Sequence, residues 1–87
     1  MNYLKYDLNQ IGPDSTVEVE LSAQANVRLM DAANFSRFHR GLRHQMYGGL
    51  AKRSPVRILI PYFAHWYAVI DLGGYGGQVR ASVRVIS

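Results

Sequence analysis

The sequence predicts an all-β fold, either an antiparallel β-sandwich or a partly open barrel of about six to eight short strands. Apolar and polar residues alternate over several short segments separated by glycine, proline and other turn residues, which is typical of strands with one dry and one wet face. The pattern contains no amphipathic helices that could connect parallel strands. With 87 residues and no cysteine, the chain is expected to form a single β-sandwich domain over residues 1–87, without disulfides.

Three alternating segments lie in the first third of the chain. Thr16–Leu21 is the clearest, because Glu18 and Glu20 separate its apolar residues. Residues 4–8 repeat the pattern more weakly, and residues 27–29 suggest a short third strand. Each segment would place its apolar side chains on one face of a sheet.

The second half contains further strand signals. A short strand is expected around residues 45–50, and another over residues 56–60, where Pro55 and Pro61 mark the ends. Residues 64–72 are the most hydrophobic segment, and their second face is also partly apolar. This segment is therefore expected in the centre of a sheet or under a covering loop.

A glycine-rich link at residues 73–77 connects this segment to a last alternating strand at residues 79–85. It lacks the Lys-Ser/Thr of a phosphate-binding loop, so it is interpreted as the turn of a β-hairpin in which at least one glycine has a positive φ. Four side chains of the hairpin are expected to be buried: Trp66, Ile70, Val79 and Val83.

One stretch departs from the alternation and predicts a single short helix or helical turn near residues 32–40. Asp31 can cap its start and Gly41 can end it. Phe35 and Phe38, three residues apart, would share one helical face.

The net charge of +4 is unevenly distributed, since no acidic residue occurs between Asp31 and Asp71. Arginine grips carboxylates and phosphates bidentately, so this basic segment favours an acidic partner. Six residues form the candidate anion-binding site: Arg37, Arg40, Arg43, His44, Lys52 and Arg53. Alternatively, these side chains pair with the N-terminal acids, cover apolar surface with their stems or form an ordinary solvated surface. Arg80 and Arg84 are expected to pair across strands with Glu18 and Glu20.

No motif points to catalysis, a metal or a cofactor. His39 and His44 are five residues apart, not the four of a helical metal pair. His65 could approach an aspartate in the fold, and Ser54 or Ser82 could act as a nucleophile, but no nucleophile motif surrounds either serine. We therefore expect no enzyme activity, no catalytic residues, no metal site and no cofactor.

Several short stretches together resemble a small bacterial domain family of unknown function. They cover nearly the whole chain: VRLMD (27–31), NF (34–35), RG (40–41), RHQ (43–45), YGG (47–49), KRSP (52–55), HWY (65–67), DLGGY (71–75) and RASVR (80–84). The resemblance implies a compact β-sandwich that is sometimes attached to a TIR domain, where it would sense a ligand and position an effector. It implies no established activity.

These observations favour a non-enzymatic recognition module that binds an anionic ligand through an arginine-rich surface. The ligand would be a nucleotide, a nucleic acid, a phosphorylated metabolite or an acidic protein surface. The alternative is a purely structural or self-associating β-sandwich, for which a homodimer is the commonest assembly. The sequence shows neither a secretory signal nor a membrane-spanning segment, so we expect no membrane insertion and a cytoplasmic location.

Overall fold

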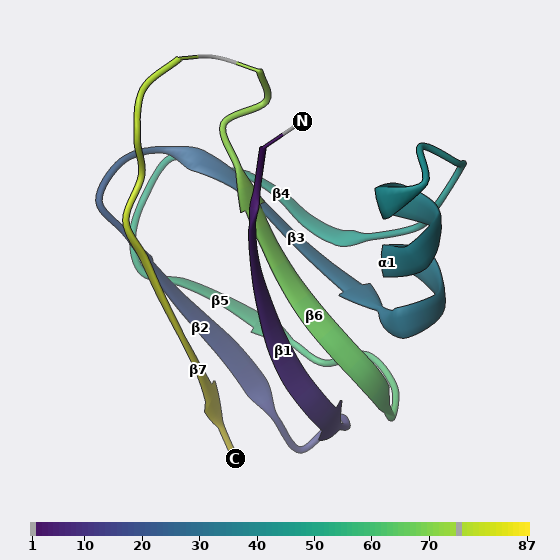
Figure 1. Ribbon diagram of the computed structural model, residues 1–87. Coiled ribbons are helices and arrows are strands. Elements are labelled where there is room, and N and C mark those ends of the chain that lie inside the picture. The colour runs from purple at the N-terminus through teal and green to yellow at the C-terminus, as the bar shows by residue number, and fades with distance from the viewer. Residues whose placement is uncertain (1, 75) are drawn as a thin grey trace.

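Two antiparallel sheets pack face to face in the computed structural model, which describes residues 2–74 and 76–87 (Figure 1). Over these residues the elements are β1 (Leu4–Ile11), β2 (Thr16–Leu21), β3 (Ala25–Asp31), α1 (Ala32–His39), β4 (Tyr47–Ala51), β5 (Val56–Leu59), β6 (Ala64–Asp71) and β7 (Ala81–Ile86). Because each sheet keeps its own edge strands, the fold is a β-sandwich and not a closed barrel. The predicted all-β class is confirmed.

The larger sheet has the strand order β1–β6–β3–β4, and the smaller sheet has the order β5–β2–β7. β6 therefore lies inside the larger sheet, as its apolar second face indicated. β2, which alternates most clearly in the sequence, is the central strand of the smaller sheet. Its Val17 is opposite Ile58 of β5 on one side and Val85 of β7 on the other.

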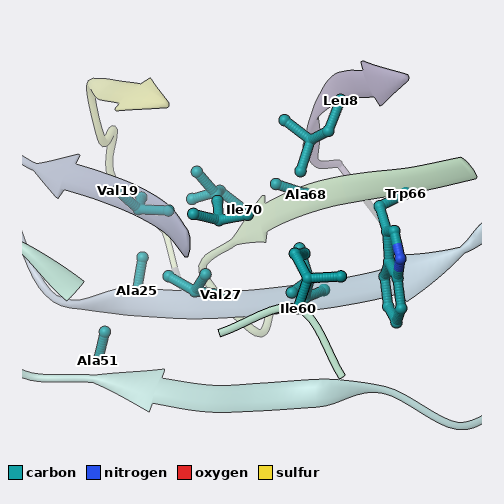
Figure 2. Close-up of a cluster of buried hydrophobic side chains, with 11 residues drawn as sticks. Leu8, Val19, Ala25, Val27, Ala51, Ile60, Trp66, Ala68 and Ile70 are labelled. Atoms are coloured by element: carbon teal, nitrogen blue, oxygen red, sulfur yellow. The ribbon is translucent and has the colours of Figure 1, made fainter. Parts of the chain in front are cut away.

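The core lies between the sheets and consists of the inward-facing side chains of both. Val19 from the smaller sheet and Val27 and Ile70 from the larger sheet are at most 1% exposed. Figure 2 shows these three side chains between the strands, together with the ring of Trp66. The Trp66 indole Nε1 donates a hydrogen bond to the Tyr62 carbonyl at 3.0 Å, so the buried ring keeps its polar atom paired.

The predicted hairpin between residues 64–72 and 79–85 is wrong. β6 and β7 belong to different sheets, and the glycine-rich link carries the chain from one layer to the other (Figure 1). Nine residues, 72–80, separate the two strands, whereas tight hairpins use about two to five. Alternation predicts the buried face of each strand but not its partner, and both of these strands face the same interior.

The burial expected for this pair of strands is confirmed only in part. Trp66 and Ile70 are buried as predicted. Val79 and Val83 are half-buried and pack against the core from the opposite layer. β7 also starts two residues later than predicted, at Ala81.

The link between these strands has the glycine conformations that the sequence predicts. The φ angles of Gly73, Gly74 and Gly77 are 65°, 88° and 111°, a region that other residues rarely adopt. Tyr75, in the same link, lies outside the described residues.

The predicted short helix is present as α1, and it covers part of the outer face of the larger sheet. Asp31 caps α1 by accepting a hydrogen bond from the backbone N–H of Asn34 at 2.9 Å, and Gly41 follows its end with a φ of 74°. Phe35 stacks on Tyr67 of β6, with ring centroids 4.9 Å apart. A helix, and not a loop, therefore covers the second face of β6. Within residues 2–74 and 76–87, no helix has the length and apolar character needed to cross a membrane.

Candidate anion-binding surface

The six candidate anion-binding residues fall into two separate groups. Four belong to α1 and the loop after it, and we call them the α1 basic surface: Arg37, Arg40, Arg43 and His44. Lys52 and Arg53 lie in the connection from β4 to β5. β4 is antiparallel to β3, with Ala51 opposite Ala25 at the start of β3, whereas α1 follows the end of β3. Across seven residues of β3, at about 3.3 Å each, the two groups are roughly 20 Å apart.

The orientation of α1 directs Arg37 and the C-cap residue Arg40 to solvent. Phe35 faces the sheet, and Phe38 lies on the same side of the helix. Because successive helical residues are rotated by about 100°, Arg37 and Arg40 lie on the opposite side. Both are exposed. The predicted spacing thus gives a helix with one aromatic face and one cationic face.

The loop after α1 folds back along the helix. The backbone N–H of Gln45 donates a hydrogen bond to Asn34 Oδ1 at 2.8 Å, in the first turn of α1. The His44 ring packs edge-on against Phe38 with centroids 5.2 Å apart, and its Nδ1 donates to the Leu42 carbonyl at 3.0 Å. Arg43, exposed and directly before His44, is therefore held beside α1.

The arginines of the α1 basic surface have no acidic partner within the part of the chain that the structure describes. Arg37, Arg40 and Arg43 take part in none of its salt bridges. The acid-free interval between Asp31 and Asp71 explains this, because neither the helix nor its loop supplies a carboxylate. The alternative that these arginines pair with the N-terminal acids is wrong.

Three other arginines behave differently, and the first is Arg28 on β3. Its Nε lies 2.6 Å from Oδ2 of Asp71, whose side chain is completely buried. Asn26 Nδ2 and the Gly73 backbone N–H donate to Oδ1 of the same carboxylate at 3.0 and 2.8 Å. Burial alone would raise the pKa of Asp71, but the hydrogen bonds from Arg28, Asn26 and Gly73 outweigh it and hold the pKa below its usual value.

The other two arginines bind Glu18 at the centre of the smaller sheet. Arg84 Nε and Arg57 Nε lie 2.6 and 2.8 Å from its two carboxylate oxygens, and the Glu18 side chain is only 3% exposed. The hydrogen bond from Arg84 lowers the pKa of Glu18 most, burial opposes it, and Arg57 adds to the lowering. The predicted pairing of Arg84 across strands is confirmed. The predicted pairing of the Arg80 side chain with an acid is not found among the described residues. The backbone N–H of Arg80 donates a hydrogen bond to Ser22 Oγ at 2.8 Å.

Asp31, at the start of α1, is also occupied by structural bonds. The Tyr62 hydroxyl donates to Asp31 Oδ2 at 2.5 Å, and the side chain of Asn34 donates to Oδ1 at 3.0 Å. Burial would raise the pKa of Asp31, but these donors lower it overall. Donation to Asp31 in turn raises the pKa of Tyr62 to about 12.

His65 meets an aspartate, as the sequence allowed, but it does not meet a serine. Its Nε2 donates to Asp7 Oδ1 at 2.6 Å on the outer face of the larger sheet. Ser82 lies on β7 of the smaller sheet, and the Ser54 hydroxyl accepts a hydrogen bond from Leu21 at 2.8 Å. The structure therefore does not place His65 next to either candidate nucleophile.

The sequence interpretation missed the cations that hold α1 on the sheet. The Lys5 ammonium lies 5.1 Å from the centroid of Phe35 and 5.5 Å from that of Tyr67, and the Arg28 guanidinium lies 5.6 Å from that of Phe38. Lys5 is exposed, as the outward parity of β1 indicated, but its ammonium also lies over two aromatic rings, which the alternation did not predict. The position of α1 over this face, which brings Phe35 close to Lys5, could not be read from the alternation of β1.

A hollow with a volume of about 1110 Å³ opens at the end of the sandwich, between the start of β1 and the link from β6 to β7. Its described lining combines apolar side chains, including Leu4 and Val79, with Arg80. Tyr3 lies at its border with α1, because the Tyr3 hydroxyl is 2.6 Å from Nδ1 of His39. The α1 basic surface lies beyond this border, on the outer face of the larger sheet.

Comparison with known proteins identifies a family without a defined activity. The model of the family DUF1883, described as a domain of unknown function, matches residues 1–87. No curated protein and no solved structure matches the chain.

Proposed function

The chain belongs to the DUF1883 family, whose description names no activity, so we propose a function from the distribution of charge. We propose that the protein is a non-enzymatic recognition module that binds an anionic ligand through the α1 basic surface. One observation carries the proposal. Arg28, Arg57 and Arg84 each bind a buried carboxylate, whereas the arginines of the α1 basic surface are exposed and bind no acid among the described residues.

The closeness of these unpaired guanidiniums favours an anion. Arg37 and Arg40 are three residues apart, so their Cβ atoms are about 5–6 Å from each other. Like charges at neighbouring positions of a helix repel, and a phosphate or carboxylate bridging them removes the repulsion and accepts bidentate hydrogen bonds. The C-terminal end of α1 attracts cations through the helix dipole, which stabilises part of this charge but leaves both side chains free to bind.

The separation of the two basic groups sets the length of ligand each could take. The α1 basic surface can bind a short anion, such as a nucleotide or a phosphorylated metabolite, by itself. Lys52 and Arg53 lie roughly 20 Å away, so they would add contacts only to an extended polyanion such as a nucleic acid strand. Ligand length is therefore the variable that distinguishes these classes.

The experiment is a titration of the protein at low salt with ATP and with a single-stranded oligonucleotide of about 20 nucleotides. The double variant Arg37→Glu/Arg40→Glu is compared with Lys52→Glu/Arg53→Glu, which makes the same change of charge at the far end of β4. We expect the first variant to lose binding of both probes and the second to weaken only the oligonucleotide.

Two results would refute the proposal. Either no probe binds the parent protein at low salt, or both double variants weaken ATP equally, as expected for unspecific attraction to a basic protein. Each would favour the purely structural alternative. Bacterial origin, attachment to TIR domains and a cytoplasmic location stay predictions of the sequence.

A further inference from the structure

The edge strands of the sandwich are not equally protected. Natural sheets interrupt or shorten their edges because free backbone groups pair with other chains. β1 shows a register shift between Asp7 and Gln10, β4 contains Gly48 and Gly49 with φ angles of 109° and 148°, and β5 has only four residues. β7 has none of these protective features. It runs for six residues without proline or glycine and pairs with β2 without a register shift.

The backbone of β7 faces outward at alternate residues. The Ser22 N–H donates to the Arg80 carbonyl at 2.9 Å, so Arg80 and every second residue after it direct their backbone groups toward β2. Ala81, Val83 and Val85 therefore direct theirs away from β2. The Ala81 carbonyl accepts a hydrogen bond from the Tyr6 hydroxyl at 3.2 Å, and in the described part of the chain no strand pairs with this edge.

This edge is complementary to itself. If two β7 strands pair antiparallel about a twofold axis at Val83, Val83 lies opposite its own copy and Ala81 lies opposite Val85 of the other copy. The outward backbone groups of all three residues then face one another, and the Ala81 carbonyl, which already accepts from Tyr6, offers its second lone pair. In this register Arg84 of one copy lies opposite Ser82 of the other, and Ser82 is itself opposite Glu20 of β2. An axis at Arg84 would instead place two arginines directly opposite each other, which is unfavourable.

We propose that the β7 edge binds a second copy of this chain, joining two three-stranded sheets into one antiparallel six-stranded sheet. This inference does not depend on the proposed function. α1 lies on the outer face of the other sheet, away from β7 (Figure 1), so pairing at β7 leaves the α1 basic surface open in both copies.

The first test is sedimentation of the protein at increasing concentrations up to about 1 mM, where even a millimolar Kd is detectable. We expect a reversible monomer–dimer equilibrium in the parent protein. Amide hydrogen exchange at Val83 and Val85 should slow as the dimer fills, whereas exchange at β2-facing residues of β7 should not change. A parent protein that stays monomeric over the whole range would overturn the proposal.

Two kinds of variant locate the contact. Val83→Pro removes an outward N–H and no hydrogen bond to β2, so we expect it to remain monomeric. Ser82→Glu and Ser82→Lys change an exposed side chain opposite Arg84 of the other copy. The glutamate should tighten the dimer and the lysine weaken it, each by about 2- to 30-fold in Kd over two symmetric pairs.

The Ser82 variants still test pairing at the β7 edge if Val83→Pro fails to fold. Equal dimerisation of Ser82→Glu and Ser82→Lys, or a reversed order, would overturn the proposed register. A folded Val83→Pro variant that dimerises like the parent would overturn the use of this edge.

Discussion

The arginines that hold the sandwich together differ from the arginines of α1 in one respect, the presence of a carboxylate. Arg28, Arg57 and Arg84 each lie within 2.8 Å of a carboxylate that the strands bury. Arg37 on α1 and Arg40 at its C-cap lie in an acid-free part of the chain. The same residue type therefore supports the fold in one region and remains available to a ligand in the other.

The largest effect should come from breaking the most buried pair. Arg28→Gln leaves the Asp71 carboxylate buried without its cation, which costs about 3–5 kcal/mol of unfolding free energy. Arg40→Gln makes the same chemical change on α1 and should cost less than about 0.5 kcal/mol. Urea unfolding followed by the fluorescence of Trp66, the single tryptophan, measures both values. Similar losses of unfolding free energy in the two variants would contradict the distinction between the paired arginines and those of the α1 basic surface.

A smaller effect is expected at the centre of the smaller sheet. Glu18→Gln keeps the shape of the side chain but leaves the Arg57 and Arg84 guanidiniums facing a neutral amide. Its melting temperature should fall below that of the parent. Glu20→Gln, on the same strand and exposed, is the matched control and should melt close to the parent. If Glu20→Gln lowers the melting temperature as much, Glu18 has no special role.

Acid should weaken the ion pairs that Glu18 and Asp71 form with arginine. The pKa values of Glu18 and Asp71 are lowered in the folded protein, from ordinary values of 4.5 and 3.8. The unfolded chain therefore binds protons more readily, so stability is full above these ordinary values and falls as the pH drops through the lowered ones. Thermal unfolding between about pH 6 and pH 2 measures this loss of stability. Glu18→Gln should show a shallower loss than the parent, and an unchanged pH profile would contradict this origin of acid sensitivity.

Alternation and capping residues are local, and they predicted the strands and the helix of this fold. Thr16–Leu21 is a strand with the predicted bounds, and Asp31 caps α1 as expected. Pairing partners are not local. Nothing in residues 73–77 distinguishes a hairpin from a crossing between layers, so the link from β6 to β7 was misassigned. The pairing of Arg28 with Asp71 depends on the register of β3 with β6, which alternation does not supply.

The candidate site was predictable to the same extent. The spacing of Arg37 and Arg40 predicted that they share one side of a helical turn, since α1 and its C-cap are local structure. The position of Lys52 and Arg53 depends on the direction of β4, because an antiparallel return carries them away from α1. Charge along the sequence thus identified a basic segment but could not show that β4 divides it in two.

The central claim is that the arginines of the α1 basic surface are free to bind anions. The salt dependence of oligonucleotide affinity tests this claim most directly. For single strands, the slope of log K against log salt changes by about 0.7 for each phosphate contact. Arg37→Gln/Arg40→Gln/Arg43→Gln should therefore have a slope shallower than the parent by about 2, with an unchanged melting temperature. An unchanged slope in the triple variant would contradict the claim, because other cations of the protein would then provide the contacts.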